Sequence, residues 1–312
     1  MTLAVIFPGQ GSQSLGMLAK LSEKYSDIKH TFAEASENLG YDIWTVAQQG
    51  PEERLDATAC TQPALLTAGA ALWRVWQAQG GPQPAFMAGH SLGEYTALVC
   101  AGALDFSSAV KLVEFRGQVM QAAVPAGAGA MAAVLGLGDG AVEAACAEAA
   151  EGQVVAAVNF NAPGQVVIAG HKAAVERAGK LCKNRGAKRV VPLPISVPSH
   201  CALMKPAAEQ LAGRLAGVNF QPAAIPIIHN VDVAAHAGAD AIREVLKAQL
   251  YSPVRWVETI QHLARQGVTT LVELGPGGVL AGLGKRIDKS LNTYPVYDPA
   301  GLDAALAAIK GL

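Results

Sequence analysis

A serine between two glycines has the clearest capacity for chemistry in this chain. The pentapeptide Gly-His-Ser-Leu-Gly at residues 89–93 follows a short apolar run, 85–88, and precedes a segment of helical character, 94–101. This G-x-S-x-G pattern is typical of a nucleophile elbow, in which a strand turns sharply into a helix and exposes the serine hydroxyl. Free N–H groups at the N-terminus of such a helix stabilise an oxyanion. The pattern therefore predicts nucleophilic catalysis by Ser91.

A structural role for the same serine stays open at this point. Ser91 and Glu94 also match the capping-box pattern S-x-x-E, in which a serine caps a helix and a glutamate returns a hydrogen bond. The two glycines favour the elbow, because a cap does not need them. The elements around the serine must decide between the two interpretations.

A nucleophilic serine needs a base, and the chain offers two histidines for comparison. His90 is a poor candidate, because adjacent side chains at a sharp turn point apart. His200 ends the segment Val-Pro-Ser-His at residues 197–200, in a loop that could face a cleft. A histidine in a loop is also often a hydrogen-bonded structural residue. Because no acid is placed as a third member, we predict a Ser91–His200 dyad whose imidazole is oriented by another group.

An arginine lies on the apolar face of a predicted helix that begins after Asp105 and ends near Ala123. Arg116 shares the helical spacing of an apolar stripe, which consists of Ala109, Leu112, Val113, Met120 and Ala123. A guanidinium that faces a core is costly unless it meets an anion. The sequence leaves two possibilities equally open: a structural pair with an internal acid, or a ligand that carries a carboxylate.

Two glycine-rich turns do not match nucleotide-binding loops. The turn Gly9-Gln10-Gly11 follows a predicted strand at 3–7, but Ser14 occupies the third glycine position of G-x-G-x-x-G. A second turn at 275–277 contains a proline, which removes an N–H that would hold phosphate. We expect the first turn instead to bring a backbone N–H near Ser91 as part of an oxyanion hole.

Strands and helices alternate along most of the chain, which predicts an α/β protein with a parallel sheet. Beyond the elements already named, the patterns predict a buried helix at 61–76, a strand at 225–230 and a strand at 269–274. Further helices are predicted at 205–215, 239–250 and 254–266.

The pattern changes between residues 125 and 196. Strands are predicted at 130–135, 154–159, 165–170 and 188–193, with helices at 139–150 and 172–185. This β-α-β-β-α-β order is typical of a ferredoxin-like unit. We therefore predict a small domain at 125–196, inserted into a large domain formed by 1–124 and 197–312.

Composition excludes several classes of protein. The chain has 24 basic and 25 acidic residues and a net charge of −1, which argues against nucleic-acid binding through phosphate contacts. We expect no membrane span, because no apolar run reaches about 18 residues, and the N-terminal apolar patch is too short for a secretory leader. The five cysteines are scattered and no histidine pair has metal-ligand spacing, so we expect reduced thiols, no metal and a cytoplasmic protein.

Taken together, these residues resemble the malonyl-CoA:acyl carrier protein transacylases of bacterial fatty-acid synthesis and the related acyltransferase domains of polyketide synthases. The resemblance covers essentially the whole chain. It is carried by blocks in the same order at residues 7–13, 61–64, 89–94, 116–117, 159–161, 197–200, 249–254 and 273–277.

The resemblance implies a role for each matching residue. Ser91 is expected to be the acylated nucleophile and His200 its base, with Arg116 bound to the free carboxylate of the malonyl group. The roles implied for the remaining positions are an oxyanion hole made by the main-chain N–H groups of Gln10 and Leu92, and orientation of the histidine by the carbonyl of Gln249. The family fold implies an α/β-hydrolase-like large domain and a ferredoxin-like small domain, with the site in the cleft between them.

The reaction implied is transfer of malonyl from malonyl-CoA to the phosphopantetheine thiol of acyl carrier protein, through a malonyl-serine ester and without a cofactor. We expect a monomer. The cluster Lys183, Arg185, Lys188 and Arg189 could dock the carrier, which is typically acidic in this family, or could be an ordinary solvated face. Two rival functions stay open: a thioesterase or esterase with the same elbow, and a module that binds the carrier without being acylated.

Overall fold

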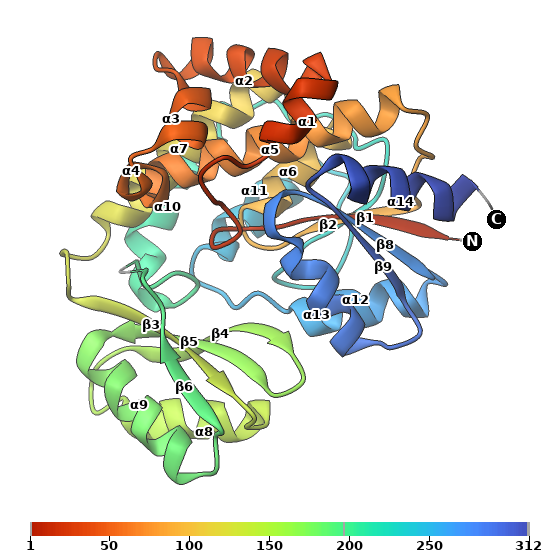
Figure 1. Ribbon diagram of the computed structural model, residues 1–312. Coiled ribbons are helices and arrows are strands. Elements are labelled where there is room, and N and C mark those ends of the chain that lie inside the picture. Colours follow the sequence, from red (N-terminus) through yellow and green to blue (C-terminus); the bar gives the residue numbers. More distant parts are fainter. Residues whose placement is uncertain (1, 196, 311–312) are drawn as a thin grey trace.

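The computed structural model describes residues 2–195 and 197–310. Its strands form two separate sheets, one parallel and one antiparallel, which lie in a larger and a smaller unit (Figure 1). The prediction of an α/β protein with a parallel sheet is confirmed. The domain boundary predicted at residue 196 lies outside the described residues.

The larger unit is built on a five-stranded sheet in which every pairing is parallel. In spatial order the strands are β7 (Ile227–Ile228), β2 (Phe86–Gly89), β1 (Leu3–Phe7), β8 (Thr270–Leu274) and β9 (Asn292–Val296). The residues of β1 are all buried, and they alternate between two hydrophobic clusters on opposite faces of the sheet. A parallel strand buried on both sides needs helices on both faces.

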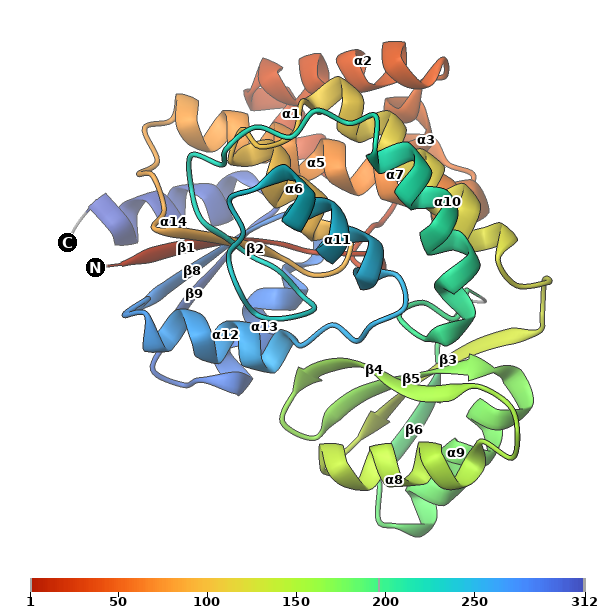
Figure 2. The ribbon, with the colours of Figure 1, turned by 180° about the vertical axis from the view of Figure 1, so that it is seen from behind.

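Helices cover both faces of this sheet, as Figure 2 shows from behind. The helices that pack into the cluster on the first face are α1 (Ala19–Lys24), α2 (Ser26–Leu39), α3 (Ile43–Gln49), α4 (Glu52–Asp56), α5 (Thr58–Ala78), α6 (Gly93–Cys100), α7 (Phe106–Ala122), α10 (Lys205–Leu215), α11 (Ala239–Gln249) and α14 (Pro299–Lys310). The opposite face is covered by α12 (Trp256–Arg265) and α13 (Val279–Ile287). Two short 3-10 turns, η1 (Ala202–Met204) and η2 (Pro276–Gly278), precede α10 and α13.

Most of the elements predicted around the serine are present. The apolar run before it is β2, the helix after it is α6, and the predicted N-cap of α7 is confirmed, because the Asp105 carboxylate accepts a hydrogen bond from the Ser108 N–H. Helix α5 begins three residues earlier than predicted and includes Pro63, which is buried. No helix within 2–195 and 197–310 is both long and apolar enough to cross a bilayer.

Two strands differ from the sequence prediction. The strand predicted at 225–230 is reduced to the two residues of β7, because Asn230 directs its N–H to a glutamate carboxylate instead of a neighbouring strand. Strand β9 was not predicted. It contains Pro295, which has no N–H to donate and is tolerated because β9 is at the edge of the sheet.

The smaller unit holds a four-stranded antiparallel sheet with two helices. The strands are β4 (Val155–Ala162), β5 (Gln165–His171), β3 (Gly129–Leu135) and β6 (Arg189–Pro192) in spatial order, and the helices are α8 (Asp139–Ala149) and α9 (Lys172–Asn184). The chain order is β3-α8-β4-β5-α9-β6. Both helices pack on one face of the sheet through a hydrophobic cluster of their own.

The other face of the small sheet turns toward the larger unit. Met131, Val158, Val167 and Ala169 on this face form a cluster with Cys201, the residue after the predicted catalytic histidine. The edge strand β4 is also joined by main-chain hydrogen bonds, of 2.8 and 3.0 Å, to Val254 in the segment after α11. Contacts of both kinds place the small sheet beside the loops that carry the predicted site.

Candidate active site

The serine lies at a sharp turn between β2 and α6, where the sequence predicted it. Ser91 has a φ of 53°, a strained conformation for a non-glycine residue. The flanking glycines serve close packing, because a Cβ on Gly89 would lie 1.9 Å from the Gly93 carbonyl carbon and one on Gly93 would lie 2.0 Å from the Phe7 oxygen. The elbow therefore needs its glycines for space, and the left-handed residue is the serine itself.

Ser91 and His200 are in contact. The Ser91 Oγ lies 2.8 Å from His200 Nε2, and His200 Nδ1 lies 2.7 Å from the main-chain oxygen of Gln249. A carbonyl oxygen only accepts, so Nδ1 carries the proton and Nε2 presents a lone pair to the serine hydroxyl. The imidazole is therefore held in the tautomer that a general base needs.

The environment keeps this imidazole neutral. His200 is 4% exposed, and its pKa is lowered from 6.5 to about 3, first by burial and then by the positive charge of Arg116. The hydrogen bond to Gln249 acts in the opposite direction and is outweighed. Ser91 therefore faces a neutral base throughout the physiological pH range.

Arg116 enters the site from α7 and is 1% exposed. Its guanidinium donates to the side-chain oxygens of Gln62 and Gln249 at 2.8 Å each, and to Ser91 Oγ at 3.2 Å. Among the residues that the structure describes, no carboxylate forms an ion pair with it. Of the two possibilities left open by the sequence, the direct pair with an internal acid is not found in the described residues. The buried Glu94 attracts Arg116 only at longer range, and the hydrogen-bond acceptors of the cation at the serine are neutral.

Two main-chain N–H groups are available beside the serine hydroxyl. Gln10 and Leu92 both line the small cavity, of about 50 Å³, that contains Ser91 and His200. In the described part of the chain, neither N–H donates to another protein group, whereas the Ser91 N–H is bound to Asn230 Oδ1 at 2.7 Å. Beside the serine hydroxyl, the N–H groups of Gln10 and Leu92 therefore have no acceptor among residues 2–195 and 197–310.

The capping-box interpretation of Ser91 is wrong. Helix α6 has no side-chain cap, and the Ser91 hydroxyl is bound to His200 and Arg116. The Glu94 carboxylate, which the capping box would return to the cap residue, is bound to His229 and to the Asn230 N–H instead. No spacing signal in the sequence linked Glu94 to residues so far along the chain.

His90 does not contact the serine hydroxyl. Its Nε2 lies 2.8 Å from Asn161 Oδ1 on strand β4 of the smaller unit, so this elbow residue joins the two units. A cavity of about 380 Å³ adjoins it, and Asn159, Asn161 and Ile195 also line its walls. Because Gln10, His90 and Ile195 line both this cavity and the catalytic one, the two are neighbours along the seam between the units.

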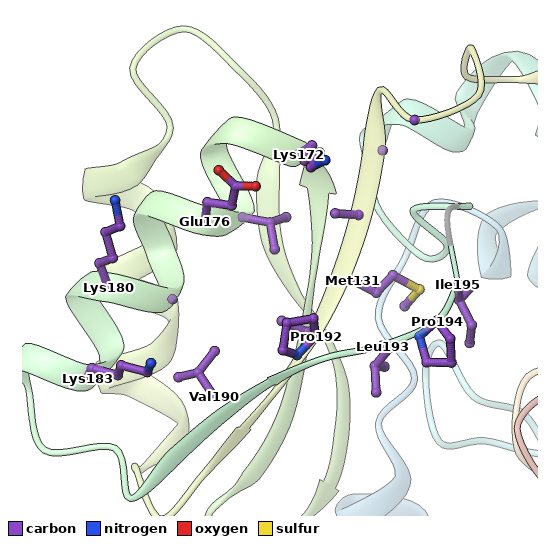
Figure 3. Close-up of a pocket in the computed structure, with 16 residues that line it drawn as sticks. Met131, Lys172, Glu176, Lys180, Lys183, Val190, Pro192, Leu193, Pro194 and Ile195 are labelled. Carbon is purple, nitrogen blue, oxygen red and sulfur yellow. The ribbon is translucent and has the colours of Figure 1, made fainter.

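A further groove, of about 660 Å³, lies on the smaller unit between α9 and β6. Figure 3 shows Lys172, Lys180 and Lys183 of α9 on one side and Met131 and Ile195 on the other. Met131 and Ile195 also line the catalytic cavity. The groove therefore extends from the mouth of the site along a helix that carries three exposed lysines.

Comparison with known proteins agrees with this geometry. Residues 4–302 match the family model of the acyl transferase domain. The chain is 60% identical to the malonyl CoA-acyl carrier protein transacylase of Escherichia coli strain K12, over 97% of this chain and 98% of that protein. It is 45% identical to the Bacillus subtilis protein of the same name, over 99% of this chain and 97% of that one.

Solved structures resemble the chain over its whole length. An acyl carrier protein S-malonyltransferase from Vibrio cholerae superimposes with a TM-score of 0.95 at 62% identity and covers 97% of this chain and 99% of its own. A malonyl-transacylase in complex with its type II PKS acyl-carrier protein superimposes with a TM-score of 0.98 at 57% identity, over 99% and 100% of the two chains.

The lowered pKa of His200 predicts an unusual pH dependence for reaction of the serine. Phenylmethylsulfonyl fluoride should sulfonylate Ser91 at a rate that changes less than about twofold between pH 8 and pH 5, because a base with a pKa of about 3 stays neutral throughout this interval. Intact-mass spectrometry measures the rate, with Ser91→Ala as the unreactive control. A rate that falls in step with an ordinary histidine, near pH 6.5, would show that His200 is protonated in the folded protein.

Proposed function

The chain belongs to the acyl transferase family, and from that premise we propose that it transfers the malonyl group of malonyl-CoA to the phosphopantetheine thiol of an acyl carrier protein. It is an acyltransferase, and its curated relatives are named for this reaction. The observation that carries the proposal is a serine in contact with a neutral histidine on one side and an unpaired buried guanidinium on the other.

The first half of the reaction acylates the serine. His200 Nε2 removes the hydroxyl proton while Ser91 Oγ attacks the thioester carbonyl of malonyl-CoA. The N–H groups of Gln10 and Leu92 stabilise the oxyanion of the tetrahedral intermediate. As the intermediate collapses, the C–S bond breaks, the histidine returns its proton to the sulfur, and coenzyme A leaves with a malonyl-serine ester in place.

In the second half a thiol is the attacking group, whereas in the first half the thiol of coenzyme A was the leaving group. The phosphopantetheine thiol of the carrier gives its proton to His200 and attacks the ester carbonyl. The C–O bond to Ser91 breaks, and the histidine returns the proton to the serine oxygen. Each half-reaction uses the same base and oxyanion hole, which makes the proposed sequence a ping-pong transfer.

The buried arginine gives the site its selectivity for malonyl. The distal carboxylate of the acyl group would bind the Arg116 guanidinium, which now has only neutral acceptors from Gln62, Gln249 and Ser91. An acetyl group would leave this cation without an anion, and the lost charge-assisted hydrogen bonds would disfavour it.

The finer features of the fold belong to the same proposal. We assign an α/β-hydrolase-like large domain to residues 1–124 and 197–312 and a ferredoxin-like small domain to residues 125–196. The parallel sheet with its serine elbow supports the first assignment, and the β-α-β-β-α-β order supports the second. A monomeric state and a cytoplasmic location complete the proposal.

The carrier is proposed to dock on the basic side of the smaller unit. Within the predicted basic cluster, Arg185 is bound to Glu148, whereas Lys183, Lys188 and Arg189 are exposed on and after α9. Lys183 also lines the groove of Figure 3 that leads to the catalytic cavity. An acidic carrier held here would present its phosphopantetheine arm toward the seam between the units.

Acylation of Ser91 can be measured directly. Brief mixing with malonyl-CoA should increase the intact mass of the protein by one malonyl group, and Ser91→Ala should remove this adduct. Ser199→Ala is the matched control, because Ser199 is the other serine that lines the cavity, and it should keep the adduct. Absence of an adduct on the wild type would leave only a binding module, and release of free malonate without transfer to the carrier would indicate a thioesterase.

A further prediction concerns the guanidinium. Arg116→Ala should lower the ratio of malonyl to acetyl transfer by about 100-fold, because one charge-assisted clamp contributes several kcal/mol at most. Steady-state transfer with both CoA thioesters measures the ratio. Arg265→Ala removes an exposed arginine from α12 and serves as the control. A ratio unchanged in Arg116→Ala would disprove the clamp.

Another prediction concerns docking. Reversing Lys188 and Arg189 to Glu should raise the KM for the carrier about tenfold at low salt and less at 0.5 M salt, where charges are screened. The KM for malonyl-CoA should not change. Lys20→Glu with Lys29→Glu makes the same change of charge on exposed residues of α1 and α2. If both double variants change the KM for the carrier equally, the cluster is an ordinary solvated face and not a docking site.

A further inference from the structure

A buried polar network lies behind the elbow, outside the residues that touch the proposed substrate. Glu94 of α6, His229 and Asn230 are each 0% exposed. His229 and Asn230 follow β7, the short strand that pairs with β2. They therefore lie beside the end of β2, where the serine turn begins. None of the three lines the catalytic cavity.

Asn230 binds both sides of the turn that contains the nucleophile. Its side-chain oxygen accepts a hydrogen bond from the Ser91 N–H at 2.7 Å, and its side-chain nitrogen donates to the Gly89 carbonyl oxygen at 2.7 Å. One planar amide therefore satisfies a donor and an acceptor that lie two residues apart on the main chain. Those groups would otherwise be buried without partners where the strand stops.

The turn needs such a restraint because its central residue is strained. Ser91 has a positive φ, which a non-glycine residue adopts only where the surrounding structure enforces it. On the other side of the turn, Gln249 Nε2 donates to the Ser91 carbonyl oxygen at 3.0 Å. The main-chain N–H and C=O of the serine are thus both held by side chains, and the N–H is held by Asn230.

Glu94 fixes Asn230 in turn. Its Oε2 accepts from the Asn230 N–H at 2.9 Å, and its Oε1 lies 2.8 Å from His229 Nδ1. Glu94 is only three residues after the serine, on the first turn of α6. The contacts therefore form a closed circuit from Ser91 to Asn230, from Asn230 to Glu94, and back along the helix to Ser91.

We propose that Asn230 is a positioning residue for the nucleophile, held in place by Glu94. It sets the main chain of Ser91 so that Oγ points at His200 Nε2. It also removes the Ser91 N–H from the oxyanion site, which leaves that site to Gln10 and Leu92. The inference rests on the proposed function only for Ser91 as the nucleophile, and malonyl selectivity is not required.

The first test separates positioning from binding. In single-turnover acylation by malonyl-CoA, Asn230→Ala should lower the maximal rate about 10- to 100-fold, as a small misplacement of a reacting group does. The half-saturating concentration should change less than about threefold, because Arg116 and the cavity walls are untouched. Rates are expressed per folded protein, measured by circular dichroism, and Asn292→Ala supplies an exposed asparagine as the control.

A second variant gives a signature that a merely structural role would not produce. In Asn230→Asp, one oxygen of the ionised carboxylate accepts from the Ser91 N–H. The other oxygen faces the Gly89 carbonyl, to which it cannot donate because it carries no proton. When protonated, the same group donates to that carbonyl and reproduces the amide. Its acylation rate should therefore rise as the pH falls from 8 to 5, whereas the wild-type rate stays flat. The titratable or charged side chains around Asn230 include Glu94 and Tyr95 of α6, His229, Asp232 and His236 of its own segment, and Arg255 directly before α12. His90, Arg116 and His200 lie across the elbow.

Sulfonylation by phenylmethylsulfonyl fluoride keeps this inference distinct from the malonyl assignment. Ser91 Oγ forms the S–O bond, fluoride leaves, and His200 takes the proton. If malonyl-CoA gives no adduct on the wild type, the proposed function fails, and a sulfonylation rate lowered in Asn230→Ala still supports the positioning role. Asn230→Ala within twofold of the wild type, or Asn230→Asp with a flat pH profile and the wild-type rate, would overturn it.

Discussion

A buried positive charge that forms no ion pair with any carboxylate of residues 2–195 and 197–310 is the constraint on which this site depends. Burial of an isolated guanidinium is costly, so the fold surrounds Arg116 with the neutral oxygens of Gln62 and Gln249 and leaves Ser91 Oγ within reach. The same charge helps to keep His200 deprotonated, because an imidazolium beside it would be repelled. The Arg116 cation therefore helps to keep the base neutral and, in the proposed reaction, binds the carboxylate of the acyl group.

Gln249 explains how the site orients its histidine without an acid. Its main-chain oxygen accepts from His200, its side-chain oxygen accepts from Arg116, and its side-chain nitrogen donates to the Ser91 carbonyl. A carboxylate in this place would pair with Arg116 and would raise the pKa of His200 by its negative charge. The first change would neutralise the cation that the proposed substrate needs, and the second would favour the protonated form of the base. One neutral residue at the end of α11 binds all three partners, His200 through its main chain and the other two through its side-chain amide, and it adds no charge.

The sequence was informative wherever function depends on local pattern. A short stretch of sequence is enough to recognise the glycines around Ser91, the arginine on an apolar stripe and the Asp105 cap. Elbows, helix faces and caps are local structures, so their patterns span only a few residues. Asn230 and Glu94 do not, because their partners lie more than 130 residues apart in the chain and meet only after β7 has paired with β2. The turn at residues 9–11 was expected to supply an oxyanion N–H, but the choice of Gln10 within it and the role of Gln249 came from the family resemblance, since a main-chain group leaves no signal in residue type. Strand β9 was missed because an edge strand with a proline carries little strand pattern.

The smaller unit covers the elbow and forms one side of the entrance to Ser91. The elbow lies at the carboxyl end of β2, and strand β4 covers this end through the His90–Asn161 contact and the main-chain bonds to Val254. Val254 lies only five residues after Gln249, so the wall and the histidine support share one segment of chain. In the proposed reaction two different thiols must reach Ser91 through the seam between the units, one after the other. The catalytic groups treat both alike, and discrimination between coenzyme A and a carrier protein must therefore come from the surface around the entrance, to which both units contribute.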